Sequence, residues 1–369
     1  MPSPVPWIGA ALLAIAPTTA AQVRGVARVA VDGAVGSFQE TPVATLRSAN
    51  PGPSLSKPPN ALAVDSRGRY YLTLADSGEL PAVYSATGEF IAQLGRKGAG
   101  PGEFRAANGI AIDGADTVFV VDPATSRLTV LDPAYRYVRS VPIPGGAFAV
   151  VALPRLVVVN TAAPDDHSGG TPLHGFDPRG NAVFPGLDRP KVPVGGADPL
   201  LRALAPSGDR HLWSATMFGP HRIERVDNRG RVVRALELEG RWLRPQDQFR
   251  PGLPRGQPYS SIAAVREDGA GKLWVVLRIP DANWRSGLEW PDASADRERR
   301  GTPIVKDHHR VFDCVIVVLD PTTAKVVASR RSDRVCDAMP MDGLVATLRE
   351  DEDGAQVIDI ARLTIARGR

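Results

Sequence analysis

The chain has 369 residues, 43% of them hydrophobic, with 36 Gly and 34 Pro. This length exceeds the size at which one compact core usually stops growing, so the chain has either two domains or many small cores in a repeat. The formal net charge is +4, and no basic cluster with interleaved aromatic residues is present, which argues against a nucleic-acid partner.

The N-terminus carries a short apolar stretch, Trp7–Ala16, followed by small residues. The stretch is too short to span a bilayer as a helix, and Thr19 and Ala21 fit the small-residue rule for signal-peptide cleavage. We therefore predict a signal peptide over residues 1–21 and one exported, periplasmic or secreted domain over residues 22–369. The leader lacks Lys and Arg, so a misassigned start or an uncleaved tail is the alternative. No other long apolar run occurs, and no transmembrane segment is expected.

Short β-branched segments bounded by turn residues begin near residue 60 and predict strands. The first four are ALAVD from Ala61, YYLTLA from Tyr70, AVYSA from Ala82 and FIAQLG from Phe90. The next four are GIAID from Gly109, VFVVD from Val118, Arg127–Asp132 and Tyr137–Ile143. The shift from Asp65 to Asp113 is 48 residues, and a four-strand period of this length is typical of a propeller or a solenoid.

The turn after the third strand of each unit is the best marker of the repeat. Asp or Ser in first position hydrogen-bonds the backbone ahead, Pro presets φ, and Gly suits the last position of a type I turn. The marker occurs as SATGE at Ser85, DPAYR at Asp132, DPRGN at Asp177, DNRGR at Asp227 and DPTTA at Asp320.

The spacing between the last two turns, 93 residues, is long enough to contain another blade. Asp281–His309 shows no apolar alternation of period 2, so we interpret it as an insertion inside one blade, with seven blades as the alternative. Two C-terminal strands, Leu344–Glu350 and Gln356–Ile365, lack an outer strand, whereas residues 23–50 contain β-like material without a blade. An N-terminal strand that completes the last blade removes the open sheet edges. We predict an all-β, six-bladed propeller of four-stranded antiparallel blades, closed in this way.

The segment GRKGAGPGEFRAANGIAIDGADTVFVVDPATSRLTVLD, from Gly95, resembles the NHL-type propeller repeat. It has a Gly-rich loop that ends in Gly-x-Phe, followed by two strands that each end in Asp. No helix follows the loop, so it is not a phosphate-binding loop, and we expect Phe104 to pack between blades. The chain resembles exported bacterial six-bladed propeller proteins of unassigned function, strongly over Asn60–Ile143 and from Arg310 onward, and weakly over Ala147–Tyr259.

Candidate functional residues concentrate on one face of such a ring. With strands A to D numbered from the axis outward, the B–C loops and the loops between blades share a face, here termed the B–C face. His167, His221, His308 and His309 fall in B–C loops, with Asp165 and Asp166 beside His167. Imidazoles and carboxylates are natural metal ligands, but long exposed loops also collect polar residues, and we favour that second interpretation.

The insertion contains Trp284 and Trp290. Exposed Trp in a loop is typical of a small-molecule or sugar platform, and the alternative is that one or both rings anchor the loop to the propeller. The two cysteines, Cys314 and Cys336, suit a disulfide in an exported chain. The alternative is two buried thiols that never meet.

These features leave two hypotheses for function. The first is a monomeric binding module for a protein, glycan or small ligand on the B–C face. The second is a metal-dependent enzyme of lactonase or lyase type, which six-bladed propellers include, with Ca or Zn as the metal. The starts of the inner strands offer Asn60 and Asn108 without a clear Glu partner, which counts against the enzyme. No catalytic residue is assigned, because a propeller site draws one residue from each blade.

Overall fold

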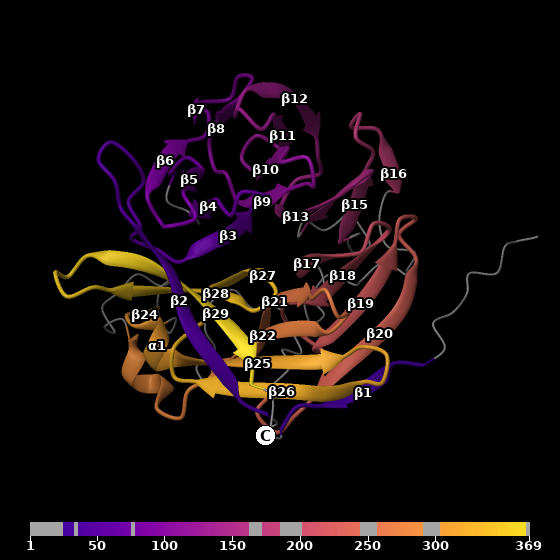
Figure 1. The fold of residues 1–369 in the computed structure, drawn as a ribbon, viewed down its shortest axis with the longest axis vertical. Coiled ribbons are helices and arrows are strands. Elements are labelled where there is room, and N and C mark those ends of the chain that lie inside the picture. The colour runs from indigo at the N-terminus through magenta and orange to yellow at the C-terminus, as the bar shows by residue number, and fades with distance from the viewer. Residues whose placement is uncertain are drawn as a thin grey trace, which may run out of the picture.

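The computed structural model describes residues 25–32, 36–74, 78–161, 172–184, 201–243, 257–290 and 303–366. The chain is a six-bladed β-propeller, as predicted, and its blades surround a central axis (Figure 1). The predicted signal peptide, residues 1–21, lies outside the described residues.

Five blades are continuous in sequence, and their strands run outward from the axis in chain order. Blades 1 and 2 consist of β3 (Pro59–Val64), β4 (Tyr70–Leu74), β5 (Ala82–Tyr84), β6 (Phe90–Gln93), β9 (Gly109–Ile112), β10 (Val118–Asp122), β11 (Arg127–Leu131) and β12 (Tyr137–Pro142). Blades 3 and 4 consist of β13 (Ala147–Leu153), β14 (Leu156–Thr161), β15 (Leu173–Phe176), β16 (Ala182–Phe184), β17 (Arg202–Ser207), β18 (His211–Thr216), β19 (Arg222–Asp227) and β20 (Val232–Glu239). Blade 5 consists of β21 (Ser261–Glu267), β22 (Leu273–Pro280), β25 (Phe312–Asp320) and β26 (Lys325–Ser332).

Blade 6 is composite, as the sequence predicted. Its inner strands are β27 (Ala338–Met341), β28 (Leu344–Glu350) and β29 (Gln356–Ile365), and its outer strand is β2 (Phe38–Arg47) from the other end of the chain. The register of this antiparallel pair runs from Phe38 opposite Ile365 to Arg47 opposite Val357. The ring therefore closes through hydrogen bonds between the two ends of the chain.

A further N-terminal strand was not predicted. β1 (Ala27–Ala30) pairs in parallel with β20 and forms a fifth, outermost strand of blade 4. Between β1 and β2, Gly36 lies against blade 5, where an added Cβ would meet the Cβ of Ala328 at 3.4 Å. The N-terminal segment thus runs along the outside of blades 4, 5 and 6 in turn (Figure 1).

The predicted turn marker works as expected in each blade where it occurs. The Oδ1 atom of Asp227 accepts hydrogen bonds from the N–H groups of Arg229 and Arg231, both at 2.9 Å. The equivalent first positions, Ser85, Asp132, Asp177 and Asp320, also accept bonds from backbone N–H groups two to four residues ahead. One local rule therefore shapes the outer hairpin of five blades.

The Asp that ends strand β10 explains the Gly-rich loop before it. The Asp122 carboxylate is fully buried and accepts the N–H of Arg105 at 2.7 Å and that of Ala124 at 3.0 Å. The carboxylate thereby holds the end of the loop against β10. Gly95, at φ +67°, has no room for a Cβ, which would lie 2.4 Å from a backbone oxygen. Phe104 is 2% exposed and packs between blades 1 and 2, as expected.

Apolar side chains hold neighbouring blades together. Six clusters of buried residues lie within the described chain, one at each junction between blades. The cluster between blades 4 and 5 is built around Trp213, and that between blades 6 and 1 includes Leu46 of β2.

Removal of residues 22–50 should destabilise the ring. Loss of the buried Leu46 side chain alone costs about 2 kcal/mol, and the truncation also leaves β29 as an exposed edge that invites aggregation. Light scattering and thermal unfolding would measure both effects. Removal of residues 22–32 alone serves as the control, because it deletes β1 and keeps β2. A monodisperse 22–50 truncation with the wild-type melting temperature would contradict the role of β2.

Candidate functional site

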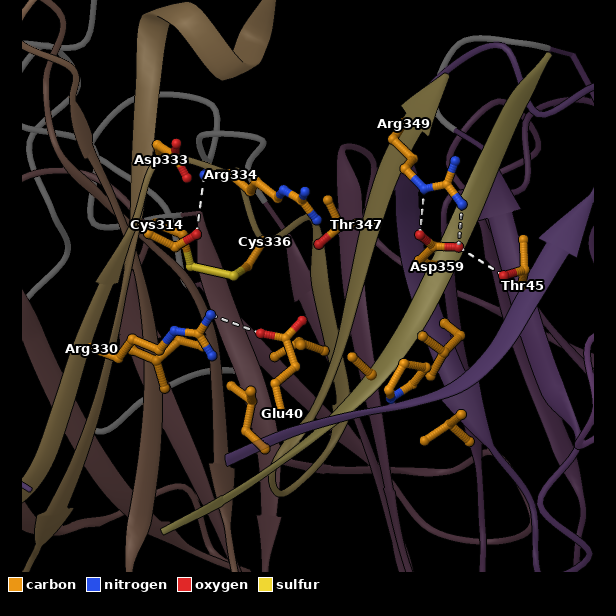
Figure 2. Close-up of a pocket in the computed structure, with 18 of the residues that line it drawn as sticks. Glu40, Thr45, Cys314, Arg330, Asp333, Arg334, Cys336, Thr347, Arg349 and Asp359 are labelled. Carbon is orange, nitrogen blue, oxygen red and sulfur yellow. Dashed lines mark hydrogen bonds and ion pairs between the residues drawn. A yellow bond between two sulfur atoms is a disulfide. The ribbon is translucent and has the colours of Figure 1, made fainter. Parts of the chain in front are cut away.

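A cavity of about 780 Å³ lies between blades 5 and 6. One wall comes from β25, β26 and the loop after β26, and the other from β28, β29 and β2 (Figure 2). Its apolar lining includes Ile316, Val345, Ile360 and Leu363. Because the cavity reaches the loop between blades and the end of the insertion, it belongs to the B–C face. We term it the blade 5–6 cleft.

Ion pairs line both walls of the cleft. On the blade 6 wall, Asp359 of β29 accepts a hydrogen bond from Thr45 at 2.8 Å and pairs with Arg349 at 2.5 Å. Glu40 of β2 reaches Arg330 of β26 at 2.7 Å and so joins the two walls. Figure 2 shows these pairs on either side of the opening. The walls therefore offer both anionic and cationic groups to a ligand.

Two further charges, Asp333 and Arg334, stand at the rim. They occupy the loop after β26, and both side chains are exposed. Within the described part of the chain neither makes an ion pair. In the view of Figure 2, the Arg334 guanidinium points from the blade 5 side toward Thr347. A free anion–cation pair at the mouth can bind a ligand with the opposite arrangement of charges.

Cys314 and Cys336 form a disulfide that lines the cleft. The bond joins the third strand of blade 5 to the loop that leads into blade 6, with a Cα–Cα distance of 5.6 Å, within the usual range. It fixes this loop, and with it Asp333 and Arg334, beside the start of β25.

His309 holds three segments together at the edge of the cleft. Its Nδ1 atom accepts the N–H of Val335 at 3.1 Å, so its Nε2–H donates to the carbonyl of Leu348 at 2.9 Å. Both ring nitrogens are thus occupied by backbone groups. The ring acts as a structural cross-link between the insertion, the loop after β26 and β28, and it is not free to act as a general base.

The described part of the insertion forms a small folded unit. It consists of η1 (Trp284–Gly287), β23 (Leu288–Glu289), β24 (Ile304–Val305) and α1 (His308–Val311), between β22 and β25. β23 and β24 pair in an antiparallel hairpin. Trp284 is 5% exposed, with the Arg285 guanidinium 4.4 Å from its ring centroid, whereas Trp290 is 41% exposed. Trp284 therefore anchors the insertion, and Trp290 is the ring that remains accessible.

The structure does not gather the predicted histidines into one site. His308 and His309 lie in the short helix α1, not in an extended segment. Partial burial and the nearby Arg278 guanidinium lower the pKa of His308. His221 is buried in blade 4, with its Nε2 atom 3.0 Å from the Ser260 hydroxyl, and burial lowers its pKa.

The remaining predicted residues are either outside the described ranges or serve in the packing of the ring. Asp165, Asp166 and His167 lie outside the described residues. In the ranges that the structure describes, no group of three His, Cys, Asp or Glu side chains could share a metal ion. The Asn60 amide donates to the carbonyl of Asn108 at 2.8 Å, which ties together the inner strands of blades 1 and 2.

Apart from His309, Cys314 and Cys336, the residues that form the cleft were not predicted from the sequence. They come from strands far apart in the chain, as in the pair Glu40 and Arg330, and no short motif marks them. A usable signal is a charged residue on a face of a strand that should pack on the next blade. Arg349 and Asp359, which lie within β28 and β29, carry that signal.

A family model described as a 6-bladed beta-propeller matches residues 65–153. Among solved structures, a protein from Bacteroides fragilis described as exported is 12% identical with a TM-score of 0.57, over 92% of this chain and 100% of the other. A member of the duf4221 family from Bacteroides vulgatus is 9% identical with a TM-score of 0.56, over 90% and 99% of the two chains. Virginiamycin B lyase from Staphylococcus aureus is 10% identical with a TM-score of 0.47, over 89% and 100%. The search of curated proteins found no match.

The family model and the two Bacteroides structures support the six-bladed fold, and identities of this size are informative about fold alone. They do not distinguish the NHL type, which stays a prediction. In the part of the chain that the structure describes, no helix is long and apolar enough to cross a membrane.

The disulfide can be tested by intact mass. Alkylation in denaturant without reductant should leave the mass unchanged, because both sulfurs are bonded, and prior reduction should allow two alkyl groups to add. In the chain-entropy model, closing a loop of this size stabilises the fold by about 3 kcal/mol, so reduction should lower the melting temperature. Two alkylated thiols in the unreduced protein would contradict the assignment.

His221 should make the fold sensitive to acid. Its pKa is lowered in the folded state, so below about pH 6.5 the unfolded chain binds a proton that the folded chain does not. The free energy of unfolding should therefore decrease as the pH is lowered, by up to about 1.4 kcal/mol per pH unit from this residue. His221→Gln keeps a polar side chain beside Ser260 and should flatten the decline between pH 7 and pH 5.5. If the free energy of unfolding declined equally with decreasing pH in the two proteins, this role of His221 would be refuted.

Proposed function

We propose that this chain is an exported binding module that takes a polar ligand with both positive and negative groups into the blade 5–6 cleft. The observation that carries the proposal is the set of charges in the cleft. Arg330, Arg349 and their acidic partners line the walls, and Asp333 and Arg334 stand unpaired at the rim within the described chain. A peptide segment or a zwitterionic small molecule has the matching chemistry.

The position of the cleft on the scaffold supports this assignment. The cleft lies between rigid sheets and next to the insertion, and binding residues concentrate on loops held by such scaffolds. Its volume of about 780 Å³ falls in the range typical of small-ligand pockets. Trp290, exposed near the same face, could extend the contact to a larger partner.

The hydrogen bonds that occupy both ring nitrogens of His309 favour binding over catalysis in this cleft. A hydrolase or lyase needs a group that can accept a proton, and the imidazole that lines the cleft has both nitrogens bonded to backbone. Elemental analysis of the purified protein separates the two hypotheses further. Stoichiometric Ca or Zn would favour the metal-dependent enzyme.

We also propose periplasmic or secreted localisation. The leader-like residues 1–21, the disulfide between Cys314 and Cys336, and the fold shared with a protein described as exported support it. An oxidising compartment is where such a disulfide persists.

The binding proposal can be tested with charge-neutral variants at the rim. Thermal-shift screening against short peptides, amino acids and oligosaccharides would provide a ligand. The double variant Asp333→Asn and Arg334→Gln should then weaken binding at least tenfold without loss of stability, because both residues are exposed and make no ion pair with the described residues. Replacement of residues 283–306 by a short Gly-Ser linker tests whether the insertion contributes.

The control is the exposed pair Arg28 and Glu239, whose atoms lie 2.8 Å apart in blade 4. Arg28→Gln with Glu239→Gln removes one positive and one negative charge, as the rim variant does, and should leave binding unchanged. Equal affinity in the wild type, the rim variant and the insertion variant would exclude this cleft as the site.

A further inference from the structure

A second cavity follows the propeller axis and differs in character from the cleft. It measures about 190 Å³ and is lined by the inner strands of all six blades. These are β3, β9, β13, β17, β21 and β27, which surround the centre of the ring in Figure 1. Small residues such as Ala61, Gly109, Ala203 and Ala263 form much of the lining, so longer side chains can reach the axis. We term this cavity the axial channel.

Three arginines enter the axial channel from blades 4 and 5. They are Arg202 on β17, Arg266 on β21 and Arg278 on β22. Arg202 pairs with the buried Glu224 at 3.0 Å, and Glu224 also pairs with Arg222 at 2.7 Å. One carboxylate therefore serves two guanidinium groups on the blade 4 side.

The guanidinium groups from blade 5 are less well neutralised. Arg266 donates only to carbonyl oxygens, those of Val265 at 2.7 Å, Leu204 at 3.0 Å and Pro340 at 3.2 Å. No carboxylate pairs with it in the described ranges of the chain. Arg278 donates to the backbone carbonyl of Asp337 at 3.2 Å but approaches its carboxylate only to 3.8 Å, and the Arg278 Nε atom is buried without a partner among the described residues.

Burial makes this excess of positive charge unfavourable. Burial lowers the pKa of Arg266 to about 10, so the group stays cationic at neutral pH in surroundings that favour the charged form less than water does. Burial also lowers the pKa of Arg278 and raises that of Asp337, which weakens the one acidic partner nearby. A cation removed from water without a counter-ion is strongly destabilising unless another charge compensates it.

We infer that the axial channel is a binding site for a small oxyanion or a carboxylate, held by Arg266 and Arg278 with Arg202 beside them. A guanidinium presents a planar fork of N–H donors that matches the two oxygens of a carboxylate, sulfate or phosphate. Among the described residues, the buried Nε–H of Arg278 has no protein acceptor, and the side chains of Arg266 and Arg278 both line this cavity. This site is independent of the ligand proposed for the blade 5–6 cleft.

The competing explanation is that Arg266 serves only as a clamp, because it joins carbonyls on β17 and β27 of blades 4 and 6. A clamp accounts for the hydrogen bonds of Arg266. It does not account for a second, poorly paired guanidinium, that of Arg278, on the same cavity. The two explanations predict different responses to anions.

Thermal unfolding and isothermal calorimetry at constant ionic strength test the inference. Sulfate, phosphate and succinate would each replace chloride, so the arms separate inorganic oxyanions from a carboxylate. A saturable rise in melting temperature with at least one of them is expected. Arg278→Gln should weaken that binding at least tenfold, and Arg155→Gln, at an exposed arginine between β13 and β14, should leave it unchanged.

A second variant keeps the test decisive if Arg278→Gln folds poorly. Met217 lines the channel and is partly buried, so Met217→Glu places a carboxylate inside it. That variant should match or exceed the wild-type melting temperature without added anion and should no longer respond to anions. No saturable response in the wild type, or an unchanged response in Met217→Glu, would overturn the inference.

Discussion

The pairing of β2 with β29 is the interaction on which the rest of the structure depends. A ring of twisted sheets is stable only when the last blade has no open edge, and here the missing edge comes from the N-terminus. The same strand supplies Glu40 to blade 5 and Thr45 to Asp359 within blade 6. The strand β2 therefore both closes the ring and forms part of one wall of the blade 5–6 cleft.

The blade that closes the ring also forms one wall of the cleft. The junction between blades 4 and 5 is packed around the buried Trp213, whose Nε1–H donates to Glu267 at 2.6 Å. Between blades 5 and 6 the apolar cluster covers only part of the interface, and Arg349 and Asp359 face the remainder. The disulfide, the hydrogen bonds of His309 and the pair between Glu40 and Arg330 hold the two blades where packing does not. Such cross-links let a cavity exist at a stable interface.

Local rules explain what the sequence could predict. The Asp that begins an outer turn, as at Asp227, forms its hydrogen bonds within four residues, so its role is visible in a short segment. The composite blade followed from counting strands. β1 has no such signal, because a parallel strand added at an edge depends on a partner 209 residues away. The cleft was missed for the same reason, since Glu40 and Arg330 meet only after the ring has closed.

The insertion is linked to both cavities through two neighbouring histidines of α1. His309 in α1 bonds to the backbone at the cleft, whereas the charges of Arg278 and Asp337, which line the axial channel, influence the pKa of its neighbour His308. Arg278 lies near the end of β22, the second strand of blade 5, just before the insertion begins, and its side chain lines the axial channel. Because a helical turn aims consecutive side chains in different directions, one short helix can bond to the cleft through His309 and sense the charges of the axial channel through His308. An insertion that was tolerated only because longer surface loops cost little entropy would need neither of these links.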